Sequence, residues 1–294
     1  MRPQDLAELL LLGIIWGASF MLMRTAAPEF GVFALVEVRT VLAFVFLMPF
    51  VLLARQLGDL RKHWRGLIFV GAFNTGIPFC LFSFSSIHLE TGLNSILNGT
   101  APMFGAIVAW LYLGDKITKS GVFGLSAGFA GVLVISEQTL GNAELSILPI
   151  LGALGATFCY GIAACFMKKH LSHAKPFAVA AGSQLFAALL LMPLAIAYWP
   201  MQAISETAWR DAIILAVMCT GLAYVMYFRL ISNVGASNAL TVAYLVPLFG
   251  IAWGYILLGE VISMQSILGG CLIIFGVMLT TGVLKKVLKR KYAV

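Results

Sequence analysis

Two stretches decide the fold of this chain, because they are copies of one another. Residues 101–118 read APMFGAIVAWLYLGDKIT, and residues 246–263 read VPLFGIAWGYILLGEVIS. They align without a gap at an offset of 145 residues, and each contains a PxFG segment and, near its end, a glycine followed by an acidic residue. Further matches at this offset are Trp64 with Trp209, Thr75 with Thr220, Gly124 with Gly269 and Gly131 with Gly276. The sequence therefore contains an internal repeat, which we divide into residues 1–140 and 141–294.

The composition around these stretches is typical of a membrane protein. Of the 294 residues, 61% are hydrophobic and only 11% are charged, and the mean hydropathy is +0.98. A helix needs about 20 predominantly apolar residues to cross a bilayer. Runs of this kind are found at residues 6–25, 32–54, 67–87, 92–113, 120–137, 148–167, 177–199, 211–230, 237–258 and 266–284. We expect an all-α membrane protein with about ten transmembrane helices.

Lysine and arginine are concentrated in every second link between these runs. Short cytoplasmic loops carry the positive excess in membrane proteins. The basic links hold Arg55, Arg61, Lys62 and Arg65, then Lys116 and Lys119, then Lys168, Lys169 and Lys175, and the tail holds Lys285, Lys286, Lys289, Arg290 and Lys291. This alternation predicts that both termini lie in the cytoplasm. It also accounts for the net charge of +7, so we expect no nucleic-acid partner.

The number of crossings in each half sets how the halves are related. Each half has about five runs, and an odd number means that the second half enters the membrane from the side opposite to the first. Two inverted five-helix repeats are an architecture on which secondary transporters build alternating access.

Three segments carry a family resemblance: WGASFMLMR from Trp16, the start of the second run around Arg39, and the two repeated stretches quoted above. With them the chain resembles the drug/metabolite transporter superfamily, specifically its ten-helix EamA-type group. The resemblance implies an exporter in the bacterial inner membrane, with a small molecule and membrane lipid as its partners, working as a monomer or homodimer. Within this group, the sequence is similar to the bacterial amino-acid exporters. Two alternatives remain open: a permease for another metabolite or drug, and a membrane sensor or assembly protein that uses the same fold.

Motifs for other chemistry are missing from the sequence. A primary pump would need a phosphate-binding GxxxxGK[ST] loop, and a zinc hydrolase would need HExxH or a similar ligand set. Neither pattern occurs. We therefore expect transport without ATP hydrolysis, no enzymatic activity, no metal and no cofactor.

Prolines and asparagines mark where polar groups lie inside the spans. Proline has no N–H, so it leaves the carbonyl four residues earlier without its helical partner. Pro102 frees the carbonyl of Asn98 in this way, and Pro247 frees that of Ala243. Pro78 does the same for Asn74, and Asn94 lies one helical turn before Asn98. We interpret Asn74, Asn94 and Asn98 as substrate-binding candidates. The alternative is that their side chains form hydrogen bonds between helices.

Aromatic residues form a second set of candidates. Rings can pack a substrate side chain and attract an ammonium through cation–π contact. The candidates come from both halves and are Trp16, Phe79, Phe82, Tyr160, Tyr224, Tyr227 and Tyr244. The alternative is ordinary packing. A lining of this kind suits neutral and aromatic amino acids.

Arg39 is an ionisable residue about two turns inside the second span. A buried Arg usually has a partner or a function. Arg39 is therefore predicted to bind a substrate carboxylate, or to pair with an acid at the outer gate such as Glu90, or to extend to the interface.

Bends and close helix contacts complete the predicted mechanism. Pro49, Pro102, Pro193 and Pro247 are predicted hinges for rocking one bundle against the other. The glycines of the fifth and tenth runs predict close helix packing. No carboxylate is expected near the middle of the bilayer, which favours movement down the substrate's own gradient.

Overall fold

The computed structural model describes residues 2–140 and 147–283. All the regular elements within these residues are helical. The helices are α1 (Pro3–Leu53), α2 (Leu57–Lys62), α3 (Trp64–Val70), α4 (Ile77–His88), α5 (Thr91–Asn98), α6 (Ala101–Val108), α7 (Lys119–Leu140), α8 (Leu148–His170), α9 (Pro176–Ala197), α10 (Glu206–Ala216), α11 (Ala223–Val234), α12 (Ala236–Ala239), α13 (Val242–Leu258) and α14 (Met264–Thr280). Three π-helical turns join some of them, namely η1 (Gly71–Gly76), η2 (Ala109–Leu113) and η3 (Val217–Leu222).

The first helix, α1, contains two spans. It bends at Gly31, whose φ of 71° and ψ of 170° are not helical. Only glycine adopts this backbone conformation readily, because it has no Cβ. The two arms of α1 thus correspond to the predicted runs 6–25 and 32–54, joined by a sharp turn instead of a loop.

The remaining spans follow the predicted boundaries to within a few residues. Seven helical segments of the described chain are long and apolar enough to cross a membrane, and the first of these is the 51-residue α1. Two shorter apolar helices, α13 and α14, follow. With the arms of α1 taken separately, the described residues make ten crossings, and the prediction of an all-α membrane protein is confirmed.

Contacts between α7 and α14 show that the two repeats are inverted. A Cβ on Gly124 would lie 2.6 Å from the carbonyl oxygen of Gly276, and a Cβ on Gly131 would lie 2.5 Å from that of Gly269. As the numbering rises along α7 it falls along α14, so the two helices run antiparallel. The repeat relates Gly124 to Gly269 and Gly131 to Gly276, and it therefore exchanges one contact for the other. This is the relationship that a pseudo-twofold axis in the membrane plane requires.

A second pair of glycine contacts obeys the same symmetry. Gly17 of α1 lies against α13, where an added Cβ would be 2.8 Å from the backbone nitrogen of Gly250. Gly161 of α8 lies against α6, where the Cβ would be 2.9 Å from the backbone nitrogen of Gly105. Each repeat thus packs helices of the other, and the small residues allow the backbones to approach closely.

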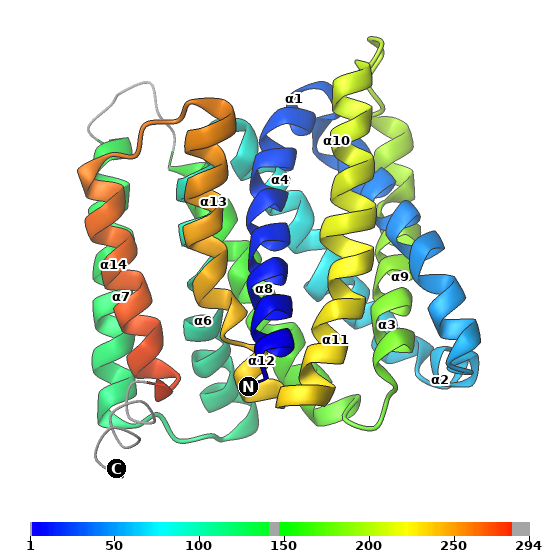
Figure 1. Cartoon of the computed structure of the whole chain (residues 1–294), viewed down its shortest axis with the longest axis horizontal. Helices are drawn as coiled ribbons and strands as arrows, with labels where there is room; N and C mark the ends of the chain where they lie inside the picture. The colour runs from blue at the N-terminus through cyan, green and yellow to red at the C-terminus, as the bar shows by residue number, and fades with distance from the viewer. Residues whose placement is uncertain (1, 141–146, 284–294) are drawn as a thin grey trace.

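The molecule has two faces in the direction of the spans. The N-terminus and the end of α14 lie on one face, the lower one in Figure 1, which we call the terminal face. The basic links around α2 and after α6 and α8 lie on this face too, as the alternation of charge predicted. The basic tail from Lys285 onward lies outside the described residues. The boundary between residues 140 and 141 adjoins a segment that also lies outside them, and it stays a prediction.

The other face, which we call the opposite face, is closed by hydrogen bonds between helices. Among them, Arg24 donates to the carbonyls of Ser86 and Ile87, Thr25 donates to Asp211, Ser205 donates to Glu29, and Thr91 donates to Glu260. The Arg24 bonds hold α1 to α4, and the others join one repeat to the second.

Candidate functional site

A cavity of about 640 Å³ lies between the two repeats. Its walls reach the terminal face, where Leu240, Thr241, Thr281 and Val283 line it and Leu240 is 56% exposed. Among the described residues, none from the turns of the opposite face lines it. The structure is therefore open towards the terminal face and closed towards the opposite one. A volume of this size is typical of a small-molecule site.

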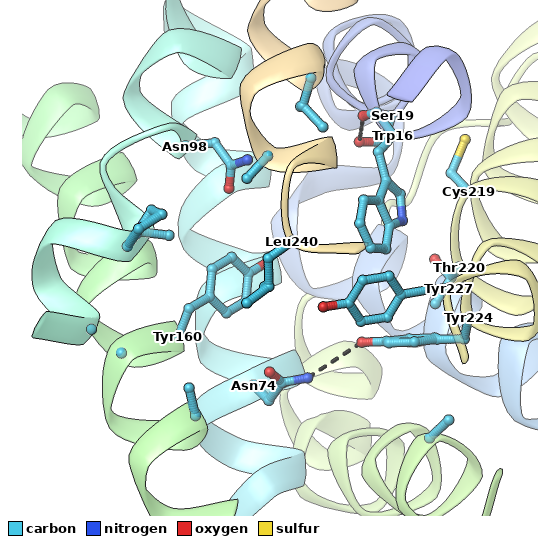
Figure 2. Close-up of a pocket in the computed structure, with 18 of the residues that line it drawn as sticks. Trp16, Ser19, Asn74, Asn98, Tyr160, Cys219, Thr220, Tyr224, Tyr227 and Leu240 are labelled. Atoms are coloured by element: carbon cyan, nitrogen blue, oxygen red, sulfur yellow. Dashed lines mark hydrogen bonds between the residues drawn. The ribbon is translucent and has the colours of Figure 1, made fainter. Parts of the chain in front are cut away.

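Most of the predicted binding residues line this cavity. They come from α1, η1, α4, α5, α8, α11 and α13, and they are Trp16, Arg39, Asn74, Phe79, Asn98, Tyr160, Tyr224, Tyr227 and Tyr244. Residues far apart in the sequence thus meet because the inverted packing brings equivalent helices of both repeats to one space. Figure 2 shows Tyr160 and Asn98 facing Trp16 and Tyr227 across it.

The aromatic walls follow the internal symmetry. The rings of Trp16 and Tyr227 are 5.2 Å apart between centroids. Their repeat counterparts are Tyr160, which lines the cavity, and Phe82, which lies behind the wall; these two rings are 6.0 Å apart. Both pairs join the first helix of one repeat to the third helix of the other. Such close ring pairs are rigid, and a rigid lining needs little ordering when a ligand binds.

A hydrogen bond joins two of the polar lining residues. The side-chain Nδ2 of Asn74 donates to the hydroxyl of Tyr224 at 3.3 Å, as the dashed line in Figure 2 shows. The bond joins η1 of the first repeat to α11 of the second, so both repeats support this wall.

Arg39 lies in the wall of the cavity and is only 6% exposed. Its Nε donates to the hydroxyl of Thr220 at 2.9 Å, and its Nη1 lies 3.6 Å from the sulfur of Met23. The centre of the guanidinium lies 3.6 Å from the ring centroid of Phe79. No carboxylate of the described chain forms an ion pair with it. The predicted pairing with Glu90 is therefore wrong for this conformation, because Glu90 lies in the turn of the opposite face and Arg39 reaches the cavity.

The α-helical hydrogen bonding of the fourth span is interrupted where the span borders the cavity. α5 ends at Asn98, a turn at Gly99 and Thr100 follows, and α6 begins at Ala101. Pro102 lies in the first turn of α6, where its missing N–H removes no helical bond. Gly99 and Thr100 keep right-handed helical dihedrals, so the α-helical hydrogen bonding is interrupted before Pro102 while the span continues. The carbonyl of Asn98 remains without the partner that a continuous helix would supply.

The matching position of the second repeat differs. Pro247 lies inside α13, which continues through it. Ala243, whose carbonyl Pro247 leaves free, also lines the cavity. Two proline-freed carbonyl positions, one from each repeat, thus border the same space.

Phe82 and Asn94 do not line the cavity, contrary to prediction. Phe82 is 2% exposed and packs its ring against Phe20 at 5.4 Å. Asn94 is fully buried and donates to the hydroxyl of Ser86 at 2.8 Å and to the carbonyl of Phe82 at 3.3 Å. Both lie about one turn nearer the opposite face than Phe79 and Asn98, where α4 and α5 are packed together. The Asn94 side chain therefore links α5 to α4 by hydrogen bonds, as the alternative interpretation of the asparagines predicted.

The remaining predicted hinges lie away from the cavity. Pro49 lies inside α1 and Pro193 inside α9, and neither helix ends there. Both prolines are exposed on the outer surface of the bundle. Their role as hinges stays a prediction.

Several lining residues were not predicted. Small polar side chains are the clearest group, and they are Ser19, Ser183, Thr220, Thr241 and Thr281. The repeat held a signal for two of them, because Ser183 is the counterpart of Arg39 and Thr220 is the counterpart of Thr75. Small polar residues are frequent in membrane helices as packing residues, so their presence alone did not distinguish them.

Acidic groups are absent from the described lining of the cavity. Among residues 2–140 and 147–283, no three His, Cys, Asp or Glu side chains are grouped as metal ligands would be. The chemistry available in the cavity is one buried cation, amide and hydroxyl groups, and rings.

Comparison with known proteins gives a consistent family. The family model described as "EamA-like transporter family" matches residues 6–137 and again residues 147–282. The two matches correspond to the two repeats of the sequence.

Curated relatives match over nearly the whole length. The chain is 26% identical over 279 residues to the "Uncharacterized transporter YvbV" of Bacillus subtilis, covering 92% of this chain and 90% of that protein. It is 25% identical over 280 residues to the "Probable terminal-alkyne amino-acid exporter" of Streptantibioticus cattleyicolor, covering 92% and 91%. It is 22% identical over 286 residues to the "Probable amino-acid metabolite efflux pump" of Escherichia coli, covering 94% of each.

A solved crystal structure of another protein shares the fold. The TM-score is 0.68 at 16% identity, and the alignment covers 98% of this chain and 99% of the other.

Proposed function

Because the chain belongs to the EamA-like transporter family, a family of transporters and not of enzymes, we propose that it exports amino acids, neutral and aromatic ones among them, by alternating access. The transport of small metabolites across a membrane follows from the family. The choice of amino acids rests on the chemistry of the cavity, and the names of two relatives agree with it.

One observation carries the proposal. The cavity lies between the inverted repeats, is lined by both, and opens towards one face while the other is closed. An amino acid has an apolar or aromatic side chain, which suits the rings of Trp16, Tyr160 and Tyr227. Its polar groups suit the amide and hydroxyl groups that remain available in the walls.

The pseudo-twofold symmetry supports the alternating-access mechanism. Equivalent contacts between the repeats can exchange, so the closed arrangement of one face can form on the other. Transport would then consist of rocking the first four spans against the sixth to the ninth. The pair α7 and α14, packed through their glycines, would act as the scaffold.

The orientation of the protein is part of the proposal. Basic links on the terminal face favour a cytoplasmic location for it, in a bacterial inner membrane. The cavity in this conformation would then face the cytoplasm, ready to load an exported substrate. Because both repeats of one chain line the cavity, a monomer would contain the site.

The mechanism needs no ATP and no strong proton coupling. No Asp or Glu of the described chain lines the cavity. Glu37 of α1 is half-buried and one of its oxygens has no hydrogen-bond partner, but it lies outside the cavity lining. We therefore propose movement down the substrate's own gradient.

Efflux from proteoliposomes tests these proposals. Vesicles containing the purified protein are loaded in turn with radiolabelled phenylalanine, leucine, threonine, lysine and glutamate, and efflux is followed with and without ionophores. Efflux of the neutral amino acids above that of protein-free vesicles is the expected result. Efflux of none of the five would reject the amino-acid proposal. A loss of efflux when the proton gradient alone is removed would reject downhill movement and would direct attention to Glu37.

A further inference from the structure

Arg39 is a buried cation without a counter-ion. Its side chain is nearly inaccessible at 6% exposure, and no carboxylate of the described chain lies within ion-pair distance of it. Removing an unpaired charge from water is costly, so buried arginines are normally paired. Here the guanidinium is held by a hydroxyl, a sulfur atom and an aromatic face, and none of these neutralises it.

The neighbours of Arg39 fix it in place and leave part of it available. The Thr220 hydroxyl accepts a hydrogen bond from Nε of Arg39 and donates one to the carbonyl of Leu215 at 3.0 Å. Phe79 covers one face of the guanidinium. The Nη2 group has no hydrogen-bond partner among the described residues, and Arg39 lines the cavity. A fixed guanidinium with free N–H groups is suited to bind a carboxylate in a forked geometry.

The other side of the cavity has the opposite polarity. α5 ends at Asn98, and residue 102, which would donate to the carbonyl of Asn98 in a continuous helix, is a proline. The proline-freed carbonyl positions of Asn98 and Ala243 both belong to the lining. The side chain of Asn98 has no hydrogen-bond partner among the described residues, and it faces the open space in Figure 2. An ammonium group would find acceptors here and rings beside them.

We propose that Arg39 binds the carboxylate of the substrate and selects against solutes that lack one. The bound amino acid would place its carboxylate on Arg39, its ammonium towards Asn98 and Ala243, and its side chain among the rings. This inference rests on the proposed function and names the polar group that the site requires. It excludes simple amines and cationic drugs as preferred substrates, because their charge would be buried beside that of Arg39.

Compounds that differ from phenylalanine only in the carboxylate or only in the ammonium group test the proposal. Initial efflux from proteoliposomes is measured for phenylalanine, for phenylalaninamide, which lacks the carboxylate, and for N-acetylphenylalanine, which keeps the carboxylate and lacks the ammonium. The wild-type protein should favour phenylalanine over the amide by at least about tenfold in kcat/KM. The N-acetyl compound should retain a clear advantage over the amide.

Two variants assign this preference to Arg39. Arg39→Gln should lose at least about tenfold in phenylalanine efflux and should abolish the preference over the amide, because the charge is gone. Thr220→Asp should cause the same loss of phenylalanine efflux and of the preference over the amide. In this variant Arg39 is kept, but the new carboxylate would neutralise its charge. The matched control is Arg24→Gln, because Arg24 binds two carbonyls near the opposite face and does not line the cavity. That control should keep the preference for the carboxylate even if its turnover changes.

The outcomes separate this proposal from the function on which it rests. Wild-type protein that moves phenylalanine and its amide equally, or Arg39→Gln that keeps the preference, would overturn the role of Arg39 and leave amino-acid export standing. If no amino acid moves, the proposed function fails. In that case stabilisation of the wild type by carboxylates in thermal unfolding, absent in folded Arg39→Gln and Thr220→Asp, would still support an anion site. No stabilisation would reject both proposals.

Discussion

Glu260, in the turn after α13, binds Thr91, the first residue of α5 in the other repeat. Its two carboxylate oxygens accept the backbone N–H of Thr91 at 3.0 and 2.9 Å, and one also accepts the Thr91 hydroxyl at 3.0 Å. A Cβ at Gly254 would collide with this carboxylate, so the glycine keeps its path free. The first N–H groups of a helix have no partner within it, and Glu260 supplies one while it closes the opposite face.

The equivalent turn of the first repeat has the same backbone and a different side-chain contact. Gly114 and Gly259 have φ values of 73° and 66°. The N–H of Asp115 donates to Ala109 at 3.2 Å, as that of Glu260 donates to Gly254 at 3.1 Å. On the open terminal face, however, the Asp115 carboxylate forms an exposed ion pair with Lys168 at 3.1 Å.

Replacing Glu260 should loosen the opposite face. Glu260→Gln removes the charge that strengthens its hydrogen bonds, which are worth about 1.5–3 kcal/mol. Hydrogen exchange measured by mass spectrometry should show faster exchange of residues 91–98. The matched control is Asp115→Asn, whose exposed ion pair contributes little, and residues 91–98 should exchange at the wild-type rate in it. Equal exchange in wild type and Glu260→Gln would show that Glu260 does not hold this face.

The two asparagines of α5 should respond differently to removal of the amide. Asn98→Ala should raise the KM for phenylalanine several-fold without lowering the Tm, because Asn98 faces the cavity and makes no side-chain bond within the described chain. Asn94→Ala should lower stability by about 1–2 kcal/mol with an unchanged KM, because it breaks buried bonds to α4. Efflux kinetics and thermal unfolding in detergent measure the two effects. The opposite pattern would contradict the assignment of Asn98 to the site.

Glycine contacts between α7 and α14 should control stability more than glycines in the cavity do. Gly131→Ala would place a Cβ 2.5 Å from the carbonyl oxygen of Gly269, and overpacking of this kind costs about 1–3 kcal/mol. Gly105→Ala is the control, since a Cβ there meets no atom within 4 Å. Thermal unfolding should show a lower Tm only for Gly131→Ala. Gly105 lines the cavity, so its variant should instead alter the KM for large substrates.

Acid should favour closure of the opposite face. Partial burial raises the pKa of Glu90 above its usual value, and the nearby charge of Glu260 adds to this, while Arg24 opposes it. When the face opens, Glu90 becomes solvated and its pKa falls, so the closed state binds the proton more tightly. Closure is therefore favoured below the raised pKa and loses this contribution as the pH rises through it.

Exchange of residues 91–98, corrected for intrinsic rates, measures this pH dependence. It should slow modestly as the pH is lowered from neutral, since the Glu90 side chain is only partly buried and solvent screens the effect. In Glu90→Gln the dependence should disappear. Faster exchange in acid, or an unchanged slope in the variant, would contradict the role of Glu90.

The sequence by itself determined the number of spans, their approximate boundaries and the inverted repeat. These depend on the length and spacing of apolar runs and on an offset that links glycines and prolines across the chain. Such features are local or one-dimensional, and the bilayer imposes them on any helix that crosses it. The division at residue 140 and the hinge role of Pro49, Pro102, Pro193 and Pro247 stay predictions.

Only the tertiary structure decided which side chains share the cavity and which face is open. Asn94 and Asn98 look alike in the sequence, yet one turn of helix separates a packed interface from an open space. Arg39 had several possible partners, and its position beside Thr220, 181 residues away in the sequence, depends on how η3 packs against α1. The two repeats encode nearly the same local structure. The difference between an open terminal face and a closed opposite face therefore arises from the contacts between the repeats. Sequence patterns within one helix cannot specify those contacts, because their energy depends on the relative position of helices far apart in the chain.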